Sequence, residues 1–164
     1  MIDDKSRIEF GKWLLERNLG WISTADVKVG VAMSVDIAML GGLAAAFSAS
    51  EPTARTAWCY FSVLVAIGCL ILGVFCAAMA ALPRMLGPVD SKIFFGRVAN
   101  TRADHYVDEF GQLTERQIID DLAMQIHRNA QIANDKHVWI RKGLMWSFLS
   151  AVPWIAGIAL LLKI

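Results

Sequence analysis

The residues AWCYFSVLVAIGCLILGVFCAAMAAL, from Ala57 to Leu82, are 26 residues without a single charged side chain. At about 1.5 Å per residue, roughly 20 apolar residues in a helix cross a bilayer core of about 30 Å. A surface helix of a soluble protein would carry a polar stripe, and this stretch has none. It therefore predicts a membrane-spanning helix.

Two weaker stretches lie on either side of it. Val29 to Ala49 contains one charged residue, Asp36, and Leu144 to Leu162 contains none, although Pro153 interrupts it. A proline is tolerated inside a membrane helix when neighbouring groups satisfy the freed carbonyl. The first stretch begins too late and is too long for the apolar part of a signal peptide. The sequence predicts an all-α membrane protein with three transmembrane helices and no cleaved leader.

The basic residues predict how these helices are oriented. Of the 16 Lys and Arg residues, five lie in residues 1–28 and nine in residues 83–143. Basic residues near the ends of spans stay on the cytoplasmic side. We therefore expect a cytoplasmic amphipathic helix in 1–28, a transmembrane hairpin in 29–82 with spans 29–49 and 57–82, a cytoplasmic sensor region in 83–143, and a third span in 144–164 with a periplasmic C-terminus.

Local patterns predict the helices of the polar segments. Residues 3–22 alternate apolar and charged side chains as an amphipathic helix does. Its apolar face either lies in the lipid headgroups, anchored by Trp13 and Trp21, or packs on other cytoplasmic helices. Residues 92–101 lack a clear period, so we expect a turn or a short extended segment there.

Two capping boxes mark where further helices begin. Thr101 and Asp104 predict a short helix that continues through about Phe110, and Thr114 with Gln117 predicts a second, stronger start. After Thr114 the chain has no Gly or Pro until Gly143. One helix over 115–162 is therefore expected. We interpret the neighbouring pair Asp120 and Asp121 as a solvent-facing pair that favours the helix dipole.

The sequence offers no constellation typical of an enzyme or a metal site. The three histidines do not have the spacing of metal ligands. Cys59, Cys69 and Cys76 all lie in the second span, so we expect neither a disulfide framework nor a metal. A net charge of +1 without a basic stripe argues against nucleic-acid binding. We expect a protein that is not an enzyme and has no cofactor.

Asp36 is the costly residue of the first span. An Asp at the centre of a membrane helix costs about 2.5–3.5 kcal/mol on insertion scales. Either it faces a bundle interior or a water-filled cavity, or the span starts late and Asp36 lies near the inner interface. If it is deep, one protomer supplies no cationic partner in its spans. This predicts a homo-oligomer in which copies of Asp36 line a polar seam, and Gly41, Gly42, Gly68 and Gly73 would permit close helix approach.

The segment from Phe94 to Tyr106 is the best candidate for ligand binding. Phe94, Phe95 and Tyr106 are able to stack on a base, and Arg97 and Arg102 to contact a phosphate. The alternative is that the aromatic residues fill a small core while the arginines face anionic lipid. A second place for a phosphate is the basic cluster of Arg128, Lys136 and Arg141.

The order of several short motifs resembles a known family. Ala25-Asp26-x-Lys28 leads into the first span, and Ile93-Phe94-Phe95-Gly96 lies in the inner segment. Gln125-Ile126, separated by nine residues from Lys136, leads into the last span. Over roughly residues 21–160 this order resembles the PycTM family, the transmembrane effectors of Pycsar antiphage systems. Asp36 departs from the neutral polar residue expected there.

The resemblance implies a function for the chain. A partner cyclase activated by phage infection makes cyclic CMP or cyclic UMP, and the effector binds this messenger and impairs the bacterial inner membrane, which aborts the infection. Two other classes stay open from the residues. One is a constitutive membrane scaffold protein, and the other is a small cation or proton channel or transporter subunit that uses Asp36.

Overall fold

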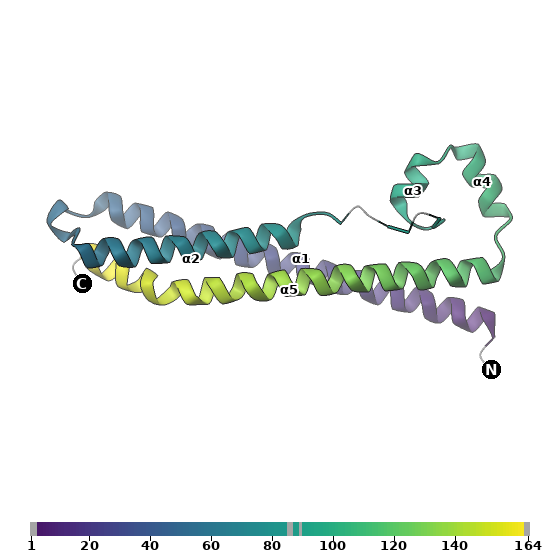
Figure 1. Cartoon of the computed structure of the whole chain (residues 1–164), viewed down its shortest axis with the longest axis horizontal. Helices are drawn as coiled ribbons and strands as arrows, with labels where there is room; N and C mark the ends of the chain where they lie inside the picture. Colours follow the sequence, from purple (N-terminus) through teal and green to yellow (C-terminus); the bar gives the residue numbers. More distant parts are fainter. Residues whose placement is uncertain (1–2, 85–86, 89, 163–164) are drawn as a thin grey trace. The chain divides into compact units, whose positions relative to one another are not determined.

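The structure, a computed structural model, describes residues 3–84, 87–88 and 90–162, and the described chain is helical (Figure 1). Three of its helices are long and apolar enough to cross a membrane, which confirms the predicted fold class. In chain order the elements are α1 (Asp4–Ala49), a 3-10 turn (Pro52–Ala54), α2 (Ala57–Ala81), α3 (Phe95–Asn100), α4 (Ala103–Gly111) and α5 (Glu115–Leu162).

The chain divides into two compact units. The polar unit consists of Met1–Thr24 and Pro83–Asp135, and the membrane unit of Ala25–Leu82 and Lys136–Ile164. Helices α1 and α5 each contribute to both units without a break. The predicted membrane boundaries at 28/29 and 143/144 stay predictions.

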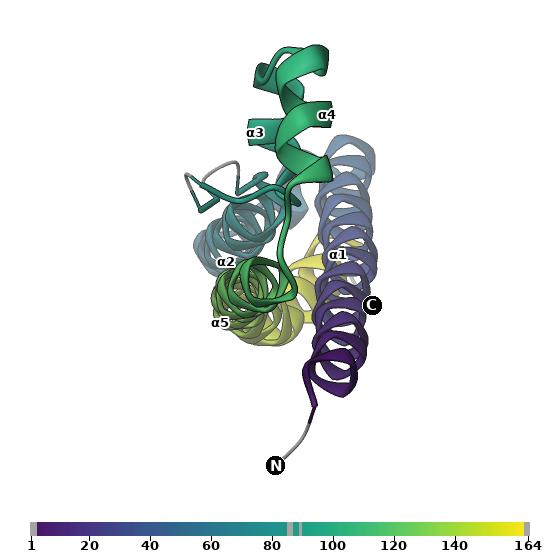
Figure 2. The same cartoon turned by 90° about the vertical axis from the view of Figure 1, so that its right-hand side faces the viewer.

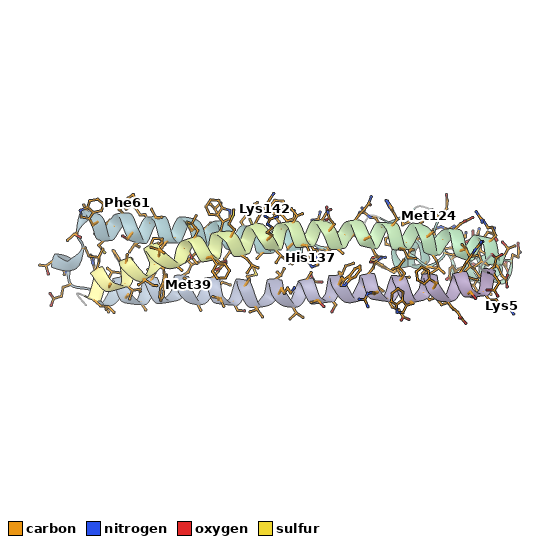
Figure 3. The ribbon with its side chains drawn as sticks, turned by 90° about the horizontal axis from the view of Figure 1, so that it is seen from below. Lys5, Met39, Phe61, Met124, His137 and Lys142 are labelled. Carbon is orange, nitrogen blue, oxygen red and sulfur yellow. The ribbon has the colours of Figure 1, made fainter. Side chains whose placement is uncertain are left out.

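The membrane unit packs α2 against parts of the two long helices, which also contact each other, since Trp154 Nε1 of α5 donates to the Met39 carbonyl of α1 at 2.9 Å. Its residues in α1, α2 and α5 lie side by side in two perpendicular views (Figures 1 and 2). Small side chains such as Ala46, Ala66 and Ala77 are buried at these contacts, which lets the backbones approach closely. Large apolar side chains point outward instead, as Figure 3 shows for Phe61, and Phe148 is 77% exposed. This inverted distribution suits a helix bundle surrounded by lipid.

Two buried apolar clusters hold this unit together. The first joins all three helices, and the second lies at the other end of the unit beside Trp139. The first cluster consists of Leu43, Ala46, Cys59, Val63, Ala66, Leu70 and Leu161, and the second of Ala25, Val29, Ala77, Ala80 and Ile140.

In the polar unit, the first turns of α1 pack on the start of α5. The Asn18 side chain, 2% exposed, donates to the Ile126 carbonyl at 3.1 Å. Gly11 lies against Leu122, which a Cβ at position 11 would meet at 3.3 Å. Of the two interpretations offered for residues 3–22, packing on another helix therefore describes this face. Trp13 and Trp21 are about half exposed, and their role as headgroup anchors stays a prediction.

The predicted turn or extended segment over 92–101 is wrong, because residues 95–100 form α3. The Ser91 hydroxyl accepts the backbone N–H groups of Ile93 and Phe94 at 3.1 and 2.9 Å. The Phe94 carbonyl then accepts the backbone N–H groups of Arg97 and Val98 in the first turn of the helix. Ser91 thus organises the entry into a helix that is too short to show a hydrophobic period.

The prediction of a capping box at Thr101 is also wrong, although the short helix predicted to follow it is present. Helix α4 has Arg102 as its N-cap and makes no side-chain cap hydrogen bond. The Thr101 hydroxyl donates backward to the Arg97 carbonyl at 2.9 Å. The box at the start of α5 is confirmed, since Thr114 and Gln117 exchange hydrogen bonds of 2.9 and 3.3 Å. The single helix over 115–162 is confirmed as well.

Candidate functional site

A cavity of about 290 Å³ in the polar unit is the candidate site. It lies between the first part of α1, the connection that follows α2, the start of α3, and α5. Its lining combines apolar side chains with arginine and amide side chains. The lining residues are Leu15, Leu19, Arg84, Ile93, Phe94, Phe95, Gln125, Arg128, Asn129 and Ile132.

Buried polar contacts fasten the connection to α5 beside this cavity. Ser91 is fully buried, and its hydroxyl accepts the Gln125 side-chain amide at 2.8 Å. The Lys92 backbone N–H donates to Asp121 Oδ2 at 2.7 Å. Asp121 is 7% exposed, so its interpretation as part of a solvent-facing pair is wrong; only Asp120 is exposed. These hydrogen bonds favour one arrangement of the connection on α5, although Asp121 Oδ1 is buried without a partner among the described residues.

Phe94 forms the aromatic wall of the cavity together with Phe95. The ring centroids of these two residues lie 4.9 Å apart with the rings tilted by 55°. A Cβ at Gly87 or Gly96 would meet the Phe94 ring at 2.6 or 2.7 Å. Both positions therefore need glycine for the ring to keep its place.

Arg84 determines which kind of ligand the cavity is suited to. Within the described part of the chain, its Nε and Nη2 are buried and have no hydrogen-bond partner. A buried guanidinium N–H without an acceptor is rare in folded proteins because its desolvation is not compensated. Among the described lining residues there is no carboxylate to supply that acceptor. The arrangement is suited to a ligand that brings negatively charged oxygens.

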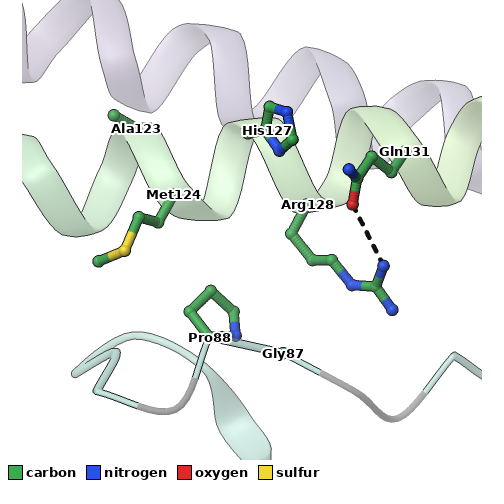
Figure 4. A pocket seen from close by; sticks show the side chains of 7 residues that line it. All are labelled: Gly87, Pro88, Ala123, Met124, His127, Arg128 and Gln131. Carbon is green, nitrogen blue, oxygen red and sulfur yellow. Dashed lines mark hydrogen bonds between the residues drawn. The ribbon is translucent and has the colours of Figure 1, made fainter.

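A second cavity, of about 640 Å³, shares Arg128 with the first. In Figure 4, Met124 and Arg128 extend from α5 toward the part of the chain that carries Gly87 and Pro88. The dashed line in that view is the hydrogen bond that Arg128 Nη1 donates to Gln131 Oε1 at 3.3 Å. This second cavity also has no carboxylate among its described lining residues.

The structure brings only part of the predicted ligand set to the first cavity. Phe94 and Phe95 line it, whereas Arg97 pairs with Glu109 at 3.3 Å. The Tyr106 hydroxyl donates to the Lys92 carbonyl at 2.9 Å. The assignment of Phe94, Phe95, Arg97, Arg102 and Tyr106 as ligand-binding residues stays a prediction.

Arg102 lines a different cavity, which is rich in acids. Asp104, Asp108 and Glu109 line that cavity with it, and Arg102 pairs with Asp104 at 2.6 Å. The hydrogen bond that Arg102 donates to Asp104 lowers the pKa of the Asp104 carboxyl. Hydrogen bonding by Lys92, 2.6 Å away, and by Arg97 lowers the pKa of Glu109. Lowered pKa values keep these carboxylates ionised, which disfavours a phosphate there.

Of the alternative basic cluster, Lys136 belongs to the membrane unit and forms an ion pair with Asp26. Lys136 is 5% exposed, whereas the Asp26 side chain is 49% exposed, so this pair joins α1 and α5 at the surface of the unit. Both residues belong to motifs of the family resemblance. Their pairing gives these motifs a structural role at the beginning of the membrane unit.

Asp36 lies where the three membrane helices meet. It is 1% exposed, and its Oδ2 accepts the Ser147 hydroxyl of α5 at 2.9 Å. A Cβ at Gly73 of α2 would lie 2.6 Å from the same oxygen. Within the described residues its Oδ1 has no partner and no cation pairs with it. Asp36 thus faces the interior of the unit, and its part in a polar seam between protomers stays a prediction.

Sequence patterns alone did not reveal Arg84 or the buried polar contacts. One feature of the sequence does indicate the polar contacts. A polar residue occurs at every fourth position of this part of α5, at Asp121, Gln125 and Asn129, so these side chains lie on one face of the helix. Asn129 donates to the Gln125 carbonyl at 2.9 Å, so this polar face continues along the cavity. For the described residues, no group of three or more potential metal ligands occurs.

Comparisons with known proteins identify the chain's relatives. The family model described as the Pycsar effector protein domain, PycTM, matches residues 10–163. The Pycsar effector protein PtPycTM of Propioniciclava tarda is 26% identical over 152 residues, which covers 85% of this chain and 74% of that protein. No solved structure matches the chain significantly.

Proposed function

Because the chain belongs to the PycTM family of Pycsar effectors, which act in abortive antiphage defence, we propose that it is a messenger-gated membrane effector. The messenger is a cyclic pyrimidine mononucleotide, cyclic CMP or cyclic UMP, made by a separate cyclase. Its binding in the polar unit changes the membrane unit so that the bacterial inner membrane loses its integrity. The chain itself carries out no chemical reaction on the messenger.

The observation that carries this proposal is the family match over residues 10–163, which overlaps all three helices that are long and apolar enough to cross a membrane. The polar unit supports it, because its cavity combines two phenylalanines with a buried guanidinium that lacks an acceptor. The distribution of basic residues supports an orientation with the polar unit and the N-terminus in the cytoplasm, where a cyclase product is made.

Helices α1 and α5 offer the route between binding and membrane damage. Both continue from the polar unit into the membrane unit. A ligand shifts a conformational equilibrium only by its difference in affinity for the two states. A helix that links the two units transmits such a difference if it is stiff.

Two measurements test the proposal. The first is a calorimetric titration of the detergent-purified full chain with cyclic CMP, cyclic UMP, cyclic AMP, cyclic GMP and cyclic dinucleotides. The second is the membrane potential of cells that express the chain with an active pyrimidine cyclase or with its inactive variant as the matched control. We expect binding of a cyclic pyrimidine nucleotide and depolarisation only with the active cyclase. Absence of binding together with equal potentials would overturn the proposal and favour a constitutive scaffold.

A further inference from the structure

The geometry points to Arg84 as the residue that binds the cyclic phosphate, in the 290 Å³ cavity, with the base against Phe94 and Phe95. This inference rests on the proposed function, since it names the site at which the messenger acts. The sequence predicted that Arg97 and Arg102 contact the phosphate, but both are paired with acids. The inference assigns the phosphate to Arg84 instead, an arginine that precedes α3 and that the sequence pattern did not single out.

The unsatisfied guanidinium is the first argument. Two of the Arg84 nitrogens are buried and lack an acceptor within the described chain, and the Arg84 side chain is one of those that line the cavity. A phosphodiester supplies two charged oxygens, which a guanidinium binds in a two-pronged manner. Arg128 lines the same cavity and adds positive charge on its α5 side. A ligand without acceptor oxygens would leave the Arg84 donors unsatisfied, and an anionic acceptor binds them more strongly than a neutral one.

The shape and size of the cavity select the rest of the ligand. Phe94 and Phe95 present aromatic rings on which a nucleobase stacks. The side-chain amides of Gln125 and Asn129 also line the cavity and offer polar groups to a base or a ribose. At about 290 Å³ the cavity lies at the lower end of the range of roughly 300–1,000 Å³ for small-molecule sites. One mononucleotide suits this volume better than a cyclic dinucleotide.

The position of the cavity explains how binding would reach the membrane unit. Leu15 and Leu19 come from α1, while Gln125, Arg128 and Asn129 come from α5. A ligand seated there contacts both helices that continue into the membrane unit. The buried contacts of Ser91 and Asp121 fix the connection against α5, so the aromatic wall moves with that helix. Binding at this cavity therefore couples α1, α5 and the connection in one step.

The test compares Arg84→Met with Arg102→Met as a matched control. Both substitutions remove one guanidinium and keep an apolar stem, but Arg102 lies in the acid-rich cavity. Cyclic CMP and cyclic UMP are titrated calorimetrically against the full chain in detergent. We expect Arg84→Met to weaken binding tenfold to a hundredfold, as the loss of a charge-assisted hydrogen bond does. Arg102→Met should stay within about twofold of the wild type.

A second measurement on the wild-type protein holds even if Arg84→Met fails to fold. Phenylglyoxal modifies accessible arginines, and mass spectrometry reads each position. We expect cyclic nucleotide to protect Arg84 and Arg128 and to leave Arg102 unchanged. If the wild type binds no nucleotide, the proposed function fails. If it binds, but Arg84→Met binds equally well or Arg84 is not protected, the site is elsewhere and the proposed function stands.

Discussion

Replacing Gly73 by alanine tests whether the contact of Asp36 with α2 and α5 stabilises the membrane unit. The added Cβ would lie 2.6 Å from Asp36 Oδ2 and 3.1 Å from Ser147 Oγ, whereas ordinary contacts begin at 3.4 Å. The carboxylate must therefore withdraw by about 0.8 Å and strain its hydrogen bond to Ser147, which is 2.9 Å long. Overpacking of this kind costs about 1–3 kcal/mol.

The matched control is Gly30→Ala, the same change at a helical position of the membrane unit that has no atom within 4 Å. There the substitution gains helix propensity, up to about 1 kcal/mol, without overpacking. The same gain applies at Gly73, so the two variants should differ by the overpacking alone. At roughly 2–4 °C per kcal/mol for a chain of this size, their melting temperatures should differ by about 2–12 °C.

The assay is thermal unfolding of both variants by circular dichroism in one detergent. In an Asp36→Ala background the clash with the carboxylate is absent, so the effect of Gly73→Ala should shrink by about 0.5–3 kcal/mol. Equal melting temperatures for Gly73→Ala and Gly30→Ala would refute the reasoning. An undiminished effect in the Asp36→Ala background would place the strain elsewhere.

Three further predictions follow from other parts of the chain. Replacing Ala130 and Ala133 together with glycine costs about 1 kcal/mol of helix propensity at each position and makes α5 less stiff. Calorimetry should still detect messenger binding, but depolarisation of the cells should be lost. Depolarisation retained at the same messenger dose would exclude α5 as the transmitting element. The chain should be a homo-oligomer in mild detergent because buried Asp36 has no cationic partner among the described residues, and a monomeric mass with and without nucleotide would contradict this. The pKa of Glu109 is lowered from 4.5 chiefly by its hydrogen bond from Lys92, so its contribution to stability is present above about pH 4.5 and is lost as the pH falls through the lowered native value. Glu109→Gln should therefore melt below the wild type at pH 7, and the gap should close in acid; a gap that does not change with pH would show that the ion pair does not stabilise the fold.

The membrane class and the long helices could be predicted from the sequence because their causes are local. Whether a helix can span a bilayer depends on its own length and apolarity. Residues 57–82 could therefore be assigned without knowledge of the residues that pack against them. The start of α5 also depends on residues that are close in the chain, Thr114 and Gln117. The short α3 could not be predicted, because its entry is organised by Ser91, which is itself held by Gln125 from 34 positions away.

The candidate site was decided by tertiary structure for the same reason. Phe94 and Phe95 could be named from their residue type, but whether an arginine is available depends on which acids fold against it. Arg97 and Arg102 face carboxylates, while Arg84 is placed in a cavity where none of the described lining residues is acidic. Sequence determined that this is a three-span membrane protein with a polar sensor candidate. Only packing between distant segments decided which charges are compensated, because electrostatic pairing depends on distance in space and not on separation along the chain.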